Sequence, residues 1–353
     1  MKIGVLTSGG DAPGMNAALR VIAVLGTAQG HEVVGIRRGY EGLLAGDAVT
    51  LTPGRVEGVA RVGGTMLGSA RSKVFPTSQG QEQAKARIRE LGLEGLVVIG
   101  GNGSLTGAHL LGRDQPCRIV GIPASIDNDV GYSMMSIGVD TAVNTIVEAC
   151  DRISDTARAH RRAFVVEVMG RHCGFLAMRA GIAAEADAIL YGEDGEQTLE
   201  QLTERLTGVL RRCFGRDSEK KRCLIVKAEG VEVPTKDIVA RLQSFLDEEI
   251  PGVDCRETVL GHVVRGGNPS ALDRLIAQRL GYAAGAALLR GAHDVMMGWD
   301  VPATVGEDTG DRRVRMVPIE VALAETERLL DGTSPVARAR LTLLEKVERL
   351  LSM

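Results

Sequence analysis

The sequence predicts an α/β protein whose mainly parallel sheets are covered by helices on both faces. Short apolar strands alternate with longer helical segments along the chain, and several of these strands run directly into glycine-rich turns. The run Leu96–Ile99 is entirely apolar, as is typical of a parallel strand buried on both faces. At 353 residues, 44% of them hydrophobic, the chain is long enough for about two domains.

The expected elements repeat the order strand, turn, helix. Apolar runs predict the strands Ile3–Thr7, Glu32–Arg37, Gly95–Ile99, Ile119–Ile122, Ala163–Val168 and Leu224–Lys227. Amphipathic or long apolar segments predict the helices Met15–Gln29, Gln81–Leu91, Ser104–Leu111, Gly138–His160, Thr198–Cys213, Lys236–Glu249 and Ser270–Leu289. Leucines along 335–353 predict a further amphipathic helix, which we expect to pack on its own domain or on a neighbouring subunit.

Composition excludes several classes of function. Lys+Arg 42 against Asp+Glu 45 gives a net charge of −3, which argues against bulk binding to nucleic acid or to an anionic membrane. Aromatic residues make up only 3% of the chain, too few for platforms that stack single-stranded bases. Because the first residues lead straight into a strand and no apolar run is long enough to span a bilayer, we expect a cytoplasmic protein. The six scattered cysteines are then expected to be reduced, mostly as small core residues.

Two glycine-rich turns have the composition of phosphate-binding sites. Gly9–Gly14 and Gly100–Ser104 each lie between an expected strand and a helix. Glycine lets backbone N–H groups approach an anion, and the helix N-terminus adds partial positive charge. Ser104 is the expected N-cap of its helix. Either turn alone could be a simple connection, but the pair favours one ligand rich in phosphate.

A third turn, at residues 123–129, supplies carboxylates. Asp127 and Asp129 follow the strand Ile119–Ile122, where one could accept a proton from a hydroxyl and the other could help to hold Mg²⁺. Phosphoryl transfer also needs cations that neutralise charge. The candidates are Arg71, Arg162, Arg171, Arg256 and Arg265. We reject a zinc site because His172 and Cys173 are adjacent and lack a partner at ligand spacing.

These turns, in this order, resemble the phosphofructokinase family. The similarity runs from Ile3 to about residue 300 and is carried by GVLTSGGDAPGMN, GGTMLGSAR, LVVIGGNGS, SIDND, VVEVMGR and TVLGHVVRGG. It implies two Rossmann-like three-layer domains with parallel-rich sheets. The expected ATP-binding domain comprises 1–138 plus 264–310, and the expected fructose 6-phosphate domain comprises 139–263 plus 311–353. It also implies a homotetramer, or a homodimer, with shared active sites.

The resemblance assigns a role to each site residue. The family transfers a phosphoryl group from ATP to the 1-hydroxyl of fructose 6-phosphate, a step of glycolysis. Asp127 would be the general base, with Arg171, Ser125 and Asp129 as the other catalytic residues. The implied ATP-binding residues are Gly10, Arg71, Ser72, Gly101, Asn102, Gly103 and Ser104, and the implied Mg²⁺ ligands are Asn102 and Asp129. The implied substrate-binding residues are Ser125, Asp127, Arg162, Met169, Gly170, Arg171, Glu229, Arg256, His262 and Arg265, of which Arg162 and Arg256 would reach a neighbouring subunit's site.

Three positions bear on the metal and on the phosphoryl donor. Asn102 stands where the family has Asp, which predicts weaker support for the metal but not loss of activity. Pyrophosphate-using relatives carry Asp at the position of Gly103 and Lys at that of Ala124, so both residues favour ATP as donor. The alternatives are a pyrophosphate-dependent enzyme and a catalytically weakened regulatory homologue. An oxidoreductase is a weaker reading still, because the first strand is not followed by the glycine pattern of dinucleotide binding.

Overall fold

A computed structural model of the chain describes residues 1–170, 173–195, 197–216 and 218–351. The chain divides into two compact units, unit 1 with Met1–Thr141 and Arg265–Asp331 and unit 2 with Ala142–Val264 and Gly332–Met353. Residues 311–331, expected in the second domain, lie in unit 1. The reason is that one strand in this segment completes the first sheet and the helix after it packs on that sheet.

Unit 1 is built on an eight-stranded sheet of order β11-β12-β10-β5-β4-β1-β2-β3. The strands are β1 Lys2–Ser8, β2 Glu32–Ile36, β3 Ala48–Thr50, β4 Gly95–Gly100, β5 Arg118–Pro123, β10 Val295–Trp299, β11 Glu307–Asp308 and β12 Val314–Pro318. Strands β2, β1, β4, β5 and β10 run parallel, whereas β3, β12 and β11 pair antiparallel at the edges. The predicted turns after β1 and β5 therefore lie on either side of the predicted turn after β4, at the carboxyl ends of these strands.

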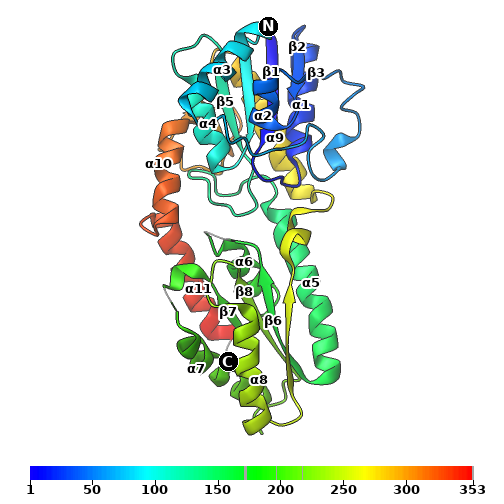
Figure 1. The fold of residues 1–353 in the computed structure, drawn as a ribbon, viewed down its shortest axis with the longest axis vertical. Coiled ribbons are helices and arrows are strands. Elements are labelled where there is room, and N and C mark those ends of the chain that lie inside the picture. The colour runs from blue at the N-terminus through cyan, green and yellow to red at the C-terminus, as the bar shows by residue number, and fades with distance from the viewer. Residues whose placement is uncertain (171–172, 196, 217, 352–353) are drawn as a thin grey trace. The chain divides into compact units, whose positions relative to one another are not determined.

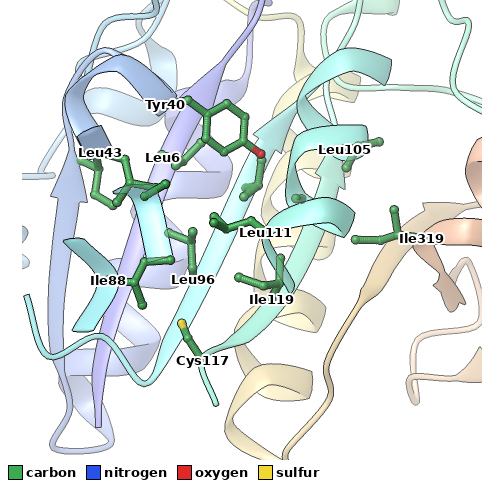
Figure 2. Packing of buried hydrophobic residues seen from close by; sticks show 14 of the residues in the cluster. Leu6, Tyr40, Leu43, Ile88, Leu96, Leu105, Leu111, Cys117, Ile119 and Ile319 are labelled. Atoms are coloured by element: carbon green, nitrogen blue, oxygen red, sulfur yellow. The ribbon is translucent and has the colours of Figure 1, made fainter. Parts of the chain in front are cut away.

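Helices cover both faces of this sheet. They are α1 Met15–Ala28, α2 Gly39–Ala45, α3 Ser78–Glu90, α4 Asn102–Gly112, α9 Ala271–Leu289 and α10 Ile319–Leu330, with a short 3-10 helix at Val59–Arg61. Helices α1 and α9 pack closely together, and a methyl group at Gly281 would lie 2.8 Å from the Ala18 carbonyl oxygen. In the core on the opposite face, strand and helix side chains interlock (Figure 2), among them Leu6, Leu96, Leu105 and Ile319.

Unit 2 is built on a parallel four-stranded sheet of order β7-β8-β6-β9. Its strands are β6 Arg162–Val168, β7 Ala188–Leu190, β8 Arg222–Ala228 and β9 Asp254–Val259. Its helices are α5 Val139–His160, α6 Phe175–Ala183, α7 Leu199–Phe214, α8 Thr235–Glu249 and α11 Pro335–Leu351, with 3-10 turns at Gly192–Asp194 and Gly261–Arg265. Figure 1 shows α8 running beside the strands of this sheet.

The two faces of the second sheet are covered by different helices. Ala188 and Leu190 join the core formed with α7 and α8. Ile189, which alternates with them, faces the other way, and a methyl group on Gly181 of α6 would lie 2.7 Å from its side chain. Helix α11 packs on α6 and β7 within the same unit. The chain thus contains two layered α/β units, which confirms the predicted fold class.

Local differences from the sequence prediction have physical reasons. Helix α4 begins at Asn102 with Gly101 as its N-cap, so the prediction that Ser104 caps the helix is wrong. The Ser104 N–H instead donates to the Gly101 carbonyl oxygen inside the first turn. Among the described residues, no helix is both long and apolar enough to cross a membrane.

Candidate active site

The first two glycine-rich turns are neighbours in unit 1. Strands β1 and β4 pair in register from Ile3 opposite Gly95 to Ser8 opposite Gly100, so both turns leave the same edge of the sheet. A methyl group at Gly9 would lie 3.1 Å from Ser104 Oγ, and one at Gly100 would lie 2.5 Å from the Ser8 carbonyl oxygen. Side chains here would push the turns apart, so glycine allows the two strand ends to meet.

The third turn lies directly beside the second. Strand β5 pairs with β4 up to Pro123 opposite Gly100, and Ala124 N–H donates to the Gly100 carbonyl oxygen at 2.9 Å. A methyl group at Gly101 would lie 3.4 Å from Ser125 Cβ. Three consecutive strands of one sheet, β1, β4 and β5, therefore present the three predicted turns together.

The aspartate turn has an alternating arrangement. Ser125, Asp127 and Asp129 are partly exposed, whereas the residues between them are buried. Ser125 Oγ donates to Asp129 Oδ1 at 2.9 Å. Asp127 and Asp129 thus lie partly exposed at the carboxyl end of β5, where ligands bind in open α/β sheets, and the Oδ1 atom of Asp127 is itself buried.

Asn128 fixes the shape of this turn, a role that the sequence analysis missed. Its backbone has a φ of 53°, a left-handed conformation that asparagine tolerates better than most residues. Its buried side chain accepts from Ser136 N–H at 2.9 Å and donates to the Met134 carbonyl oxygen at 3.0 Å. These bonds hold the backbone between the two aspartates. An asparagine between two aspartates was the available signal.

The loop that carries Arg71 and Ser72 is anchored over the first turn. Asn16 in α1 donates to the Val62 carbonyl oxygen at 3.0 Å and accepts from Met66 N–H at 2.8 Å. Ser69 Oγ donates to the Gly9 carbonyl oxygen. Ser72 Oγ accepts from Phe75 N–H at 3.1 Å, and Arg71 itself is exposed. Asn16 was also missed, because its partners lie some 50 residues away.

The first turn of α4 is supported by the aromatic side chains of Tyr40 and Phe75. The Tyr40 hydroxyl donates to the Ser104 carbonyl oxygen at 2.6 Å, and its ring stacks on Phe75 with centroids 3.8 Å apart. Burial raises the pKa of Tyr40, so its hydroxyl stays protonated as a donor. Asn102 is half-exposed and Gly103 is exposed at the N-terminus of this helix. Apart from its chain neighbours and the nearby backbone of its own helix, no atom of the described residues lies within 4 Å of the position that a Gly103 Cβ would take.

Arg265 belongs to unit 1 and lies against the first turn. Its Nη1 donates to the Asp11 carbonyl oxygen at 3.4 Å, and a methyl group at Gly10 would lie 2.2 Å from that nitrogen. Glycine at position 10 therefore admits a guanidinium group beside the turn. This cation strengthens the anion-binding character of the first turn.

In unit 2, four predicted substrate residues gather at one end of the sheet. Met169 and Gly170 follow β6, and Glu229 N–H donates to the Val168 carbonyl oxygen at 2.9 Å. His262 follows β9, whose pairing with β6 ends at Val259 opposite Glu167. Gly170 has a φ of 134°, and a methyl group there would lie 2.6 Å from the Cys173 carbonyl oxygen. Arg171, the predicted partner of the transferring phosphoryl group, lies outside the described residues.

Arg162 and Arg256 do not join that group. Arg162 opens β6, six residues before Val168, which places it about 20 Å along the strand from the turn at Met169. Both arginines pair with Asp254, Arg162 Nε at 3.4 Å and Arg256 Nη2 at 3.2 Å. Within unit 2 they therefore lie toward the opposite end of the sheet from Glu229 and His262.

The residues predicted to hold Mg²⁺ fit that ion by their chemistry. Asp129 offers a half-exposed carboxylate and Asn102 an amide carbonyl, and Mg²⁺ prefers oxygen ligands. The turns that carry them touch at Gly101 and Ser125. Together Asn102 and Asp129 carry one negative charge, which suits a Mg²⁺ ion that is also bound by the phosphate groups of a ligand.

Comparison with protein families identifies a match over most of the chain. The family model described as "Phosphofructokinase" matches residues 2–288. The chain is 46% identical to the ATP-dependent 6-phosphofructokinase of Thermotoga neapolitana over 330 residues, which are 94% of this chain and 96% of that protein. It is 45% identical to ATP-dependent 6-phosphofructokinase 1 of Thermus thermophilus over 298 residues, covering 84% of this chain and 89% of the relative.

Solved phosphofructokinase structures superpose on the chain. Phosphofructokinase from Saccharomyces cerevisiae matches with a TM-score of 0.82 and 32% identity over 99% of this chain, which spans about half (48%) of the yeast chain. A pyrophosphate-dependent phosphofructokinase from Marinobacter aquaeolei matches with a TM-score of 0.76 and 19% identity over 98% of this chain and 91% of its own, a likeness of fold alone. These matches confirm the fold that the sequence motifs implied.

Proposed function

Because the chain belongs to the phosphofructokinase family, we propose that it transfers the γ-phosphoryl group of ATP to the 1-hydroxyl of fructose 6-phosphate, giving fructose 1,6-bisphosphate and ADP. One observation carries the proposal. Two phosphate-type turns and an aspartate turn meet on the adjacent strands β1, β4 and β5 of one sheet. A cytoplasmic location follows for a glycolytic kinase.

Asp127 is the general base in this proposal. Its carboxylate takes the proton of the 1-hydroxyl as the hydroxyl oxygen attacks the γ-phosphorus and ADP departs. Ser125 donates to Asp129 and keeps that carboxylate oriented, while Asn128 holds the intervening backbone. Arg171 would neutralise charge on the transferring phosphoryl group, as the family resemblance implies.

The donor is ATP rather than pyrophosphate. The open space around Gly103, at the N-terminus of α4, leaves room for the nucleotide's phosphates where a carboxylate would repel them. Gly10, Gly101 and Ser104 supply the turns, and Arg71 with Ser72 borders them from the anchored loop. The names of the curated bacterial relatives point to the same donor.

Mg²⁺ is the proposed cofactor, held by Asp129 and Asn102 together with phosphate oxygens of the donor. When bound, the ion neutralises phosphate charge during transfer. Asn102 keeps an acceptor oxygen but lacks the negative charge of an aspartate, so the protein's share of metal binding is weaker than in relatives that have Asp there.

Recognition of the sugar phosphate is assigned to Met169, Gly170, Arg171, Glu229, His262 and Arg265. Arg162 and Arg256 lie too far along the second sheet to join Glu229 in the same chain. We therefore propose that they serve the site of a neighbouring subunit in a homotetramer or homodimer.

A single assay tests this function. The purified protein is given fructose 6-phosphate with ATP and, separately, with pyrophosphate, and fructose 1,6-bisphosphate is measured through aldolase-coupled NADH oxidation. The proposal predicts turnover with ATP and at most a small fraction of it with pyrophosphate. Faster turnover with pyrophosphate would assign the other donor, and no turnover with either would favour a regulatory homologue.

A further inference from the structure

Unit 2 buries three cysteines in one apolar core. Cys213 lies in the last turn of α7, Cys223 near the start of β8, and Cys255 near the start of β9, and all three belong to the core cluster beneath α7 and α8. Each is a free thiol and each is at most 2% exposed. The proposed phosphoryl transfer uses none of them.

The sulfur atoms of Cys213 and Cys223 are close neighbours. Their sulfur atoms and a carboxylate oxygen of Asp187 all lie within 4.8 Å of one another. A side-chain hydrogen bond with Cys213 that favours the neutral thiol, together with burial, raises the pKa of Cys223 well above its usual value. The two sulfurs thus face each other in the reduced protein.

The sheet register excludes the other pairing of Cys223. Cys223 and Cys255 both lie opposite Ala163, one on each side of β6. Two strand spacings separate their Cα atoms by about 9.6 Å. A disulfide needs Cα atoms within about 7 Å, so this pair cannot be bridged without moving β6. The Cys213 sulfur, by contrast, lies within 4.8 Å of the Cys223 sulfur.

We propose that Cys213 and Cys223 form an intramolecular disulfide when a peroxide oxidises the protein. One thiol is oxidised to a sulfenic acid as hydrogen peroxide is reduced to water. The second sulfur then attacks the first, the S–S bond forms, and a second water leaves with the displaced oxygen and the remaining proton. Two thiols thus lose two electrons and two hydrogens to one peroxide.

The Cys213–Cys223 disulfide would close a short loop and would not alter the proposed active site. It joins the two ends of the segment 214–222, which carries Lys220, whose ammonium pairs with Asp187 at 2.9 Å. Glu229, one of the expected substrate residues, follows the other end of β8, after Ala228. Oxidation should therefore raise the thermal stability of unit 2 by roughly 5 °C and leave kcat and the KM for fructose 6-phosphate unchanged.

Peptide mapping of the wild-type protein tests the proposal directly. The protein is treated with graded hydrogen peroxide, remaining thiols are blocked with N-ethylmaleimide, and the protein is digested with trypsin without reductant. Cleavage at the surrounding Lys and Arg residues yields the peptides Cys213–Arg216 and Cys223–Lys227. The expected result is a single major species in which these two peptides are joined and which a reducing phosphine separates.

Two variants and one control complete the test. Cys213→Ala and Cys223→Ala should each abolish the cross-link and the gain in melting temperature. Cys255→Ala, a change in the same core, should retain both. A dominant cross-link between other cysteines, an intermolecular product, or Cys213 and Cys223 remaining fully alkylatable after other thiols have been oxidised would each overturn the proposal. Because the map needs no kinase assay, its failure is separate from any failure of the proposed function.

Discussion

The exposed N-terminus of α4 offers a direct test of donor choice through Gly103→Asp. Outside the adjoining helix backbone, the part of the chain that the structure describes has no atom within 4 Å of the new Cβ, and Gly103 is in the first turn of the helix. The variant should therefore fold. An aspartate there replaces glycine, a poorer helix former, and its charge favours the helix dipole, so we expect a gain of about 0.5–1 kcal/mol in stability.

The same charge should weaken the binding of ATP. A carboxylate about 5 Å from a phosphate at an exposed site gives a repulsion between the limits for bulk water and for a protein surface, about 2 kcal/mol. That corresponds to roughly a 30-fold rise in the KM for ATP, because each 1.4 kcal/mol is a factor of ten. The KM for fructose 6-phosphate should change little.

Initial-rate kinetics with varied ATP, together with thermal unfolding, measure both effects. Gly103→Asn is the matched control, since asparagine has the size of aspartate without its charge and should raise the KM for ATP far less. If Gly103→Asp folds normally and its KM for ATP stays within about twofold of wild type, the donor does not pass close to position 103 and the argument for ATP fails.

Three further outcomes are expected. Gly170→Ala should destabilise the turn after β6 by about 1–3 kcal/mol and raise the KM for fructose 6-phosphate, because φ is 134° and the new methyl group meets the Cys173 carbonyl oxygen. Gly252→Ala is the control: its φ is also positive but its surroundings are open, so the KM for fructose 6-phosphate should not change. Asn102→Asp should lower the Mg²⁺ concentration for half-maximal rate several-fold, and an unchanged Mg²⁺ titration would contradict the assigned ligand. Arg279 donates to Asp311 and lowers the pKa of that carboxyl below 3.8, so the pair stabilises the fold above that pH and loses its contribution as pH falls through the lowered pKa. Arg279 also lies 4.8 Å from the centre of the Trp299 ring, a contact that does not depend on pH. Melting curves from about pH 2 to pH 7 should therefore show the gap between wild type and Arg279→Gln narrowing as pH falls, whereas a constant gap would exclude this pair as the cause.

Much of the fold was predictable because buried parallel strands form short, continuous runs of apolar residues in the sequence. The strands at Gly95–Gly100 and Arg118–Pro123 are apolar on both faces, and the sequence placed each within two residues of its ends. Strand β9, Asp254–Val259, was missed because an edge strand with an exposed side carries charged residues that hide the pattern. Helix α6, Phe175–Ala183, was missed because most of its residues are buried and it shows little amphipathic period.

The candidate site was predictable to the level of turns but not of contacts. Glycines and aspartates after strands indicated which segments could bind phosphate or accept a proton. No local pattern could show that Arg265 lies against Gly10 or that Asn16 anchors the loop before Arg71, because those contacts join residues far apart in the chain. The same limit applies to Cys213 and Cys223, whose proximity depends on how α7 packs on β8.

In the proposed reaction the carboxylate of Asp127 accepts the proton of the sugar hydroxyl, and the kcat of Asp127→Asn is the sharpest test of that role. The amide keeps the size of the side chain but cannot act as a base, so kcat with ATP should fall by about 10²–10⁴-fold while the KM for fructose 6-phosphate stays within about tenfold. Asp114→Asn, the same change at an exposed site before β5, should retain full activity. A folded Asp127→Asn protein that keeps more than about a tenth of the wild-type kcat would exclude Asp127 as the general base.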